Sequence, residues 1–143
     1  MIAMKINYKI QVVLIFVLIF AGCAGNRSDE NNEKETITEL SPEEFRSSLS
    51  STPDAVLIDV RKPEEVAEGK IEGAVNIDYT DSSFTAEVGK LDKTKPYFLY
   101  CKTGKRSTGA ADKMKIIEFQ DVYVLEGGLV NWQERGLETV KPE

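Results

Sequence analysis

One cysteine of this chain is followed by residues suited to holding an anion. Cys101 opens the segment Cys-Lys-Thr-Gly-Lys-Arg-Ser, which is predicted to join a buried strand to a helix. The backbone N–H groups of such a segment can converge at the positive end of the helix, and Gly104 permits the tight curvature. Thiols near helix N-termini and basic groups have pKa values of about 3.5–7.5 instead of about 8.5. The segment therefore predicts a reactive thiolate at Cys101, favoured by the charges of Lys102, Lys105 and Arg106. An inert core cysteine is the alternative, but such a cysteine is rarely followed by this many basic residues.

The composition excludes most other ways of activating a nucleophile. The 143 residues contain no histidine, so no Ser-His-Asp triad, Cys-His pair or histidine metal site can form. The two cysteines, Cys23 and Cys101, are too few for a disulfide framework or a four-cysteine zinc site. No metal site and no cofactor is predicted. The formal net charge of -6 argues against nucleic acid as a partner.

Strand and helix patterns alternate along residues 37–143, which are predicted to form one domain. The continuous apolar run at 55–60 is typical of a strand covered on both faces of a parallel sheet. Repeated alternation of this kind predicts an α/β domain with a mainly parallel sheet. Asp59 and Cys101 both fall at carboxyl ends of predicted strands, where such sheets form their sites. The predicted strands span 36–38, 55–60, 74–77, 96–100 and 122–124. One helix is predicted to begin at 42, and four others are predicted to span 63–68, 84–91, 108–117 and 130–135.

The first residues are typical of an export signal. Lys5 and Lys9 precede an apolar run at 12–20, which is shorter than the roughly 20 residues of a transmembrane helix. The run ends in Phe-Ala-Gly-Cys, which resembles the lipobox of bacterial lipoproteins, with phenylalanine where leucine is more usual. That resemblance implies removal of residues 1–22 and lipidation of Cys23. An uncleaved anchor with an incidental cysteine is the alternative.

Residues 23–36 are predicted to connect the lipid to the domain. The stretch from 24 to 36 has no large apolar side chain and is typical of a flexible tether. Ala24 stands where aspartate would signal retention in the inner membrane. The predicted location is therefore the bacterial cell envelope, with the lipid anchor on the periplasmic face of the outer membrane.

Three ordered segments resemble the rhodanese family. They are Leu-Ile-Asp-Val-Arg at 57–61 with Gly-Lys-Ile-Glu-Gly-Ala at 69–74, the cysteine segment at 100–107, and Gly-Gly-Leu-Val-Asn-Trp at 127–132. The resemblance covers residues 37–137 and implies the rhodanese-like α/β fold, with a mainly parallel sheet and helices on both faces. It also implies transfer of a sulfane sulfur. Cys101 would take the sulfur from a small anionic donor such as thiosulfate, hold it as a persulfide and pass it to a thiol or cyanide.

The resemblance also implies roles for individual residues. Cys101 is the expected catalytic residue. Asp59 and Arg61 match the family's Asp-x-Arg feature beside the site, although a simple strand-end ion pair explains them equally well. Lys70 replaces a common histidine, and Glu72 a common proline, outside the cysteine segment. The expected substrate-binding residues are those of the loop, namely Lys102, Thr103, Gly104, Lys105 and Arg106. The acidic residues Glu64, Glu65 and Glu68 are expected to form a solvated helix face.

Two other functions are compatible with this pattern. One is a non-catalytic rhodanese module that serves as a scaffold or a sulfur sensor, usually without the cysteine. The other is a phosphatase-like or arsenate-reductase-like enzyme. The cysteine loops of tyrosine-phosphatase-like enzymes are one residue longer than the four residues between Cys101 and Arg106. The tighter loop suits a sulfur atom better than a phosphoryl group.

Overall fold

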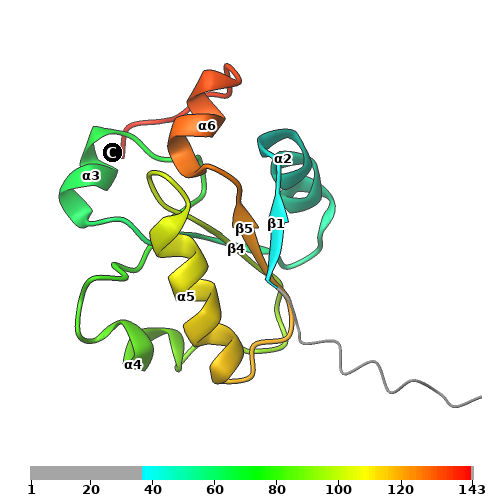
Figure 1. The fold of residues 1–143 in the computed structure, drawn as a ribbon, viewed down its shortest axis with the longest axis vertical. Helices are drawn as coiled ribbons and strands as arrows, with labels where there is room; N and C mark the ends of the chain where they lie inside the picture. Colours follow the sequence, from blue (N-terminus) through cyan, green and yellow to red (C-terminus); the bar gives the residue numbers. More distant parts are fainter. Residues whose placement is uncertain (1–36, 143) are drawn as a thin grey trace, which may run out of the picture. The chain divides into compact units, whose positions relative to one another are not determined.

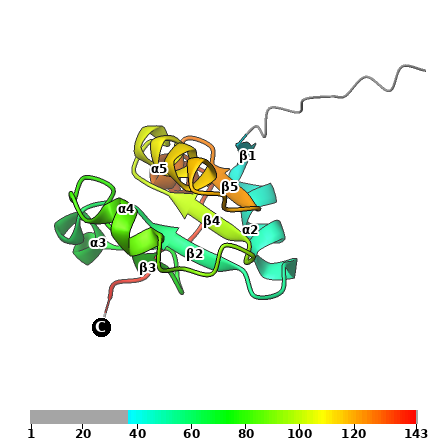
Figure 2. The ribbon, with the colours of Figure 1, turned by 90° about the horizontal axis from the view of Figure 1, so that it is seen from below.

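The computed structural model describes residues 37–142, so the predicted export signal, Cys23 and the tether lie outside the described residues. The described part contains a parallel five-stranded sheet with the strand order β1-β5-β4-β2-β3 (Figures 1 and 2). The strands are β1 (Thr38–Leu40), β2 (Val56–Asp59), β3 (Val75–Asn76), β4 (Tyr97–Tyr100) and β5 (Val122–Leu125). The helices are α2 (Pro42–Ser51), α3 (Pro63–Glu68), α4 (Phe84–Val88), α5 (Lys105–Ile116) and α6 (Gly128–Glu134).

Helices cover both faces of the sheet, as the sequence predicts (Figures 1 and 2). On one face, Ile58 and Leu99 pack with Ala110 and Met114 of α5 and with Phe84 of α4. A second cluster lies on the other face and includes Phe45 of α2 together with Leu129 and Trp132 of α6. Because both faces are buried, the central strands need continuous apolar runs. All four residues of β4 are buried.

Local signals set several helix boundaries. Ser41 and Glu44 form a capping box, in which the Glu44 N–H donates to Ser41 Oγ and the Ser41 N–H donates to Glu44 Oε2. Proline is the first residue of both α2 and α3, where its missing N–H costs no intrahelical bond. The predicted bounds of α3 therefore agree with the structure.

Four predicted elements have boundaries that differ from the structure by two residues or more. Helix α6 begins at Gly128 and not at residue 130, because Gly127 with φ +69° turns the chain into it. The first strand is Thr38–Leu40, two residues later than predicted, because it pairs in register with β5. Helix α4 stops at Val88 and not at residue 91, since the bonds that follow span three residues and tighten the chain. Helix α5 begins at Lys105, before the predicted 108, because Gly104 with φ +95° turns the chain directly into it. The apolar pattern alone does not reveal that polar first turn.

The chain after α6 is joined to the segment after α3. Lys70 and Val140 form an isolated antiparallel bridge with two N–H···O bonds of 2.8 Å. The Lys70 ammonium donates to the carbonyl of Ala74 at 2.9 Å, so the residue that departs from the family pattern has a structural contact. No helix within residues 37–142 has the length and apolar character needed to cross a membrane.

Candidate active site

Strand β4 leads directly to the candidate nucleophile. It is the middle strand of the sheet, and its last carbonyl, at Tyr100, accepts a 3.0 Å bond from the N–H of Val60. Cys101 follows at the carboxyl end of the strand and is only 1% exposed. The thiol is therefore fixed beneath its own loop, at the edge where parallel sheets form their sites.

The loop and the start of α5 direct hydrogen-bond donors at the sulfur. The Gly104 N–H donates to Cys101 Sγ at 3.1 Å, and the Ser107 hydroxyl lies 3.6 Å from the same sulfur. Burial raises the pKa of the Cys101 thiol, but the Ser107 hydroxyl and the N–H groups of Ser107, Thr103 and Gly104 outweigh it. The pKa of Cys101 is thereby lowered from its ordinary value. Of the loop amides that the sequence places near the sulfur, those of Thr103 and Gly104 interact with it, together with the N–H of Ser107.

Ser107 is a contributor that the sequence reasoning missed. Its hydroxyl also lies 2.8 Å from the carbonyl oxygen of Gly104, so its single hydrogen can serve either that oxygen or the sulfur. Ser107 is buried at the third position of α5. Its hydroxyl reaches the sulfur only because the loop before the helix curls back over Cys101, and a serine near the start of a helix does not by itself indicate this. The sequence feature that could have indicated its role is its place in the segment that follows Cys101.

Removing the Ser107 hydroxyl should raise the pKa of the Cys101 thiol. Ser107→Ala deletes the first of the interactions that lower this pKa. Arg106→Ala should raise it by less, because the charge of Arg106 is already offset by a carboxylate (see below). The pH dependence of iodoacetamide alkylation measures the change.

Thr108→Ala is the matched control for that experiment. The Thr108 hydroxyl donates to the same Gly104 carbonyl, at 3.1 Å, and among the described residues it has no hydrogen bond to the sulfur. It should leave the alkylation profile of the wild type unchanged. A Ser107→Ala profile that coincides with the wild type would show that the hydroxyl does not stabilise the thiolate.

Helix α6 closes the loop through main-chain atoms. The Leu129 N–H donates to the carbonyl of Cys101 at 2.8 Å, and the Val130 N–H donates to that of Lys102 at 3.1 Å. Gly128, with φ +62°, lies so close that a Cβ there would meet the Cys101 oxygen at 2.6 Å and the Gly104 nitrogen at 2.8 Å. Only glycine fits at this position, which explains the Gly-Gly segment physically.

The loop arginine is held by a carboxylate from another element. The Arg106 guanidinium donates to both Glu65 carboxylate oxygens, at 2.6 and 2.8 Å. The hydrogen bond from Arg106 lowers the pKa of Glu65 to about 2, so this ion pair persists at any pH near neutrality. Glu65 was predicted to lie on a solvated face, and that prediction is wrong. Acidic residues on a short helix do not reveal a partner 41 positions away.

Asp59 and Arg61 form a buried ion pair beside the loop. Arg61 is 4% exposed, and its Nη2 lies 2.7 Å from Asp59 Oδ2. The same guanidinium donates to the carbonyl of Gly69 at 2.6 Å and to that of Glu65 at 3.2 Å. Arg61 therefore connects the end of β2 to the middle of α3 and to the residue that follows it. Neither Asp59 nor Arg61 has a hydrogen bond to Cys101 among the described contacts, so the pair supports the site through α3 and Glu65.

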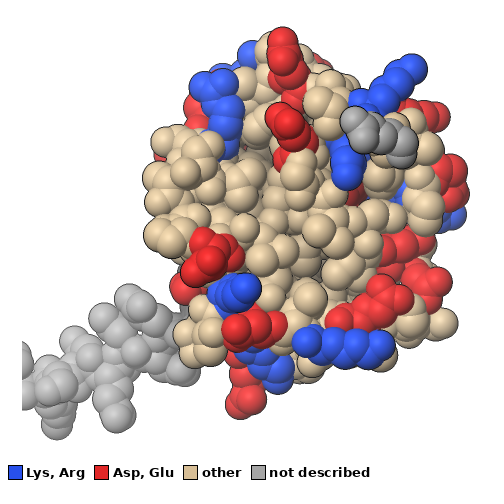
Figure 3. Space-filling view, turned by 180° about the vertical axis from the view of Figure 1, so that it is seen from behind, with Lys and Arg blue, Asp and Glu red and all other residues tan. Residues whose placement is uncertain are grey.

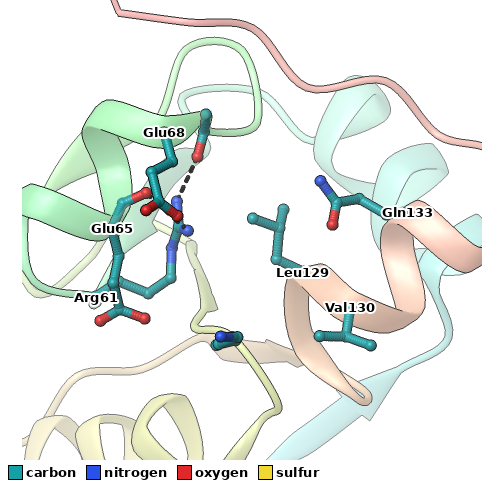
Figure 4. A pocket seen from close by; sticks show the side chains of 8 residues that line it. Arg61, Glu65, Glu68, Leu129, Val130 and Gln133 are labelled. Atoms are coloured by element: carbon teal, nitrogen blue, oxygen red, sulfur yellow. Dashed lines mark hydrogen bonds between the residues drawn. The ribbon is translucent and has the colours of Figure 1, made fainter.

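The remaining loop residues, Lys102, Thr103 and Lys105, all have exposed side chains. Thr103 contributes to the site through its backbone N–H, which interacts with the sulfur. Lys102 lines a cleft of about 140 Å³ between α3 and α6, shown in close-up in Figure 4. No group of three or more histidine, cysteine, aspartate or glutamate side chains within 37–142 could hold a metal ion. On the face seen from behind the view of Figure 1, Figure 3 shows basic side chains scattered among acidic ones.

Comparisons with known proteins agree on one family. Residues 41–135 match the family model of the rhodanese-like domain. A putative sulfurtransferase of Bacillus subtilis is 37% identical over 97 residues, which cover 68% of this chain and 91% of that protein. A sulfurtransferase of Allochromatium vinosum is 29% identical over 107 residues, covering 75% of this chain and 98% of that protein.

Structural similarity leads to the same group. The polysulfide-sulfur transferase homodimer of Wolinella succinogenes is 31% identical, with a TM-score of 0.62 and coverage of 75% of this chain and 80% of that one. Some curated relatives are longer proteins. The chain spans 29% of a probable adenylyltransferase/sulfurtransferase of Mycobacterium tuberculosis and 40% of a tRNA uridine(34) hydroxylase of Synechocystis.

Proposed function

Because the chain belongs to the family of rhodanese-like domains, we propose that it is a sulfurtransferase that works through a persulfide on Cys101. The observation that carries the proposal is the sulfur of Cys101 among converging donors, with its pKa lowered without any histidine. The sulfurtransferase relatives support the same reading. A non-catalytic scaffold has no need for a nucleophile prepared in this way.

The proposed first step loads the sulfur. The Cys101 thiolate attacks the outer sulfur of thiosulfate, a new S–S bond forms on Cys101, and sulfite leaves with the electron pair of the broken bond. The two charges of thiosulfate match the exposed ammonium groups of Lys102 and Lys105 at the loop. In the second step a thiolate or cyanide attacks the outer sulfur, and Cys101 leaves as a thiolate stabilised by the loop donors. No cofactor is needed, because one sulfur–sulfur bond is exchanged at a time.

The test is to incubate the chain with thiosulfate and to locate added sulfur by peptide mass spectrometry. The expected result is one extra sulfur atom on Cys101 and formation of thiocyanate when cyanide is added. Absence of both would favour the scaffold function. Turnover of an aryl phosphate would favour the phosphatase-like or arsenate-reductase-like alternative.

We further propose that the domain is carried as a lipoprotein on the cell envelope, through Cys23. This proposal is supported by the basic start, the apolar run and the Phe-Ala-Gly-Cys segment at 20–23. Stable anchoring would require more than one acyl chain. When the gene is expressed in a bacterium fed labelled palmitate, the label should enter the wild type and not Cys23→Ala. Equal labelling of the two proteins would contradict the proposal.

A further inference from the structure

The cleft beside the cysteine loop has two unlike walls. Figure 4 shows Arg61, Glu65 and Glu68 on the α3 side, facing Leu129, Val130 and Gln133 of α6. Its volume of about 140 Å³ is below the roughly 300–1,000 Å³ of pockets for drug-sized ligands. The cleft therefore suits a molecule of only a few non-hydrogen atoms.

The cleft adjoins the reacting residue through the backbone. Lys102, which lines it, directly follows Cys101. The α6 wall is bonded to the carbonyls of Cys101 and Lys102 through the N–H groups of Leu129 and Val130. A small molecule in the cleft would thus lie against the loop that carries the persulfide.

The charges that line the cleft are partly compensated. Asp59 neutralises Arg61, and Arg106 neutralises Glu65. Within residues 37–142, Glu68 and Lys102 have no ion-pair or side-chain hydrogen-bond partner. The cleft therefore presents one free carboxylate and one free ammonium, beside an apolar wall of Leu129 and Val130.

Arg61 contributes a further donor. A guanidinium has five N–H groups. Nε serves Asp59, Nη2 serves Asp59 and Gly69, and Nη1 uses one of its two hydrogens on the Glu65 carbonyl. One N–H of this almost fully buried side chain is left over, and Arg61 lines the cleft. Arg61 and Lys102 both line the cleft, so each is a donor available to a carboxylate bound there.

We propose that the cleft binds a small zwitterionic thiol, an amino acid of about the size of cysteine, as the sulfur acceptor. Its carboxylate would lie on Lys102 and the spare N–H of Arg61, and its ammonium on Glu68. A dianion such as thiosulfate fits the cleft less well, because Glu68 repels it. The inference rests on the proposed sulfurtransferase function and specifies the class of acceptor.

The transfer step exchanges one S–S bond for another. The acceptor loses its thiol proton to water, and its thiolate attacks the outer sulfur of the Cys101 persulfide. The bond between the two sulfurs breaks, and its electron pair stays on Cys101 Sγ as a thiolate. The acceptor leaves as a persulfide, so no external oxidant or reductant takes part.

The experiment compares four acceptors on the full-length chain in detergent micelles, loaded beforehand with thiosulfate. L-Cysteine carries both charges, 3-mercaptopropionate only the carboxylate, cysteamine only the ammonium, and 2-mercaptoethanol neither. Loss of sulfur from Cys101 is followed by mass spectrometry at low salt. Each variant's rate is divided by the wild-type rate with the same thiol, which cancels the thiol's own nucleophilicity.

Each charge of the cleft should affect its own set of thiols. Lys102→Gln should slow sulfur transfer to L-cysteine and to 3-mercaptopropionate about fivefold, which is the effect of one exposed ion pair. Transfer to cysteamine and to 2-mercaptoethanol should keep the wild-type rate. Glu68→Gln should slow L-cysteine and cysteamine by a similar factor. Glu64 is an exposed carboxylate of α3 that does not line the cleft, so Glu64→Gln should change none of the four transfer rates. Equal effects on all four thiols, or none, would overturn the proposal.

A binding measurement separates this proposal from the proposed function. S-Methyl-L-cysteine cannot accept sulfur as a thiol, and it should shift the amide NMR signals of Lys102 and Gln133 in the unloaded chain. The shifts should weaken in Glu68→Gln. If Cys101 does not load, the proposed function fails, and this titration alone decides whether the cleft binds a zwitterion. Unchanged signals would exclude such binding.

Discussion

Cys101→Ser should abolish sulfur loading and leave the fold intact. A serine hydroxyl stays protonated near neutral pH and forms no persulfide, whereas it has nearly the same shape as the thiol. The position is buried, and its neighbours Gly104 and Ser107 can hydrogen-bond an oxygen as well as a sulfur. The mass of the Cys101 peptide after thiosulfate treatment measures the first effect, and chemical denaturation measures the second.

Cys23→Ser is the matched control, because Cys23 and Cys101 are the two cysteines of the chain. It should load sulfur as the wild type does. Loading that survives in Cys101→Ser and disappears in the Cys23 variant would place the chemistry outside the described domain. Loss of the folded state in Cys101→Ser would mean that the thiol is needed for packing.

The second large effect is expected at a residue with no functional side chain. Gly128→Ala places a Cβ 2.6 Å from the Cys101 oxygen and 2.7 Å from the Lys102 carbonyl carbon, at φ +62°. Left-handed backbone costs an alanine about 1–2 kcal/mol, and overpacking costs about 1–3 kcal/mol more. The free energy of unfolding should fall by about 2–5 kcal/mol. Sulfur loading should slow by about a hundredfold, because the loop donors move away from the sulfur.

Gly136→Ala separates the cost of the left-handed backbone from the cost of the close contact. Gly136 has a similar φ of +73°, but a Cβ there would meet nothing within 4 Å. Its free energy of unfolding should fall only by the cost of the left-handed backbone, about 1–2 kcal/mol, and it should load sulfur at the wild-type rate. If Gly128→Ala behaved like Gly136→Ala in both measurements, the close contact between α6 and the loop would not shape the site.

Much of the fold is encoded locally. The run at 55–60 contains β2, the run at 96–100 contains β4, and Pro63 starts α3 where the sequence places it. These elements are recognisable because burial on both faces demands unbroken apolar residues and because proline suits a first helical turn. The polar first turn of α5 has no such pattern, and its start was placed too late.

The site was predictable only in part, for a related reason. Cys101 and its loop form one continuous segment, so their chemistry is visible in the sequence. Glu65 reaches Arg106 only because β2 and β4 lie side by side in the sheet, which brings α3 to the loop. Packing also fixes the direction of Arg61, whose guanidinium donates to the Asp59 carboxylate and to two backbone carbonyls. Contacts of this kind depend on strand order, which no local pattern states.

The bonds between α6 and the cysteine loop set an order of events during synthesis. Cys101 leaves the ribosome before Gly128, Leu129 and Val130, whose atoms hold its carbonyl and shape its turn. An unfinished chain therefore carries a cysteine whose pKa is that of an ordinary thiol. The site is complete only when the late segment docks, so the Cys101 thiolate reaches its full stabilisation at the last stage of folding.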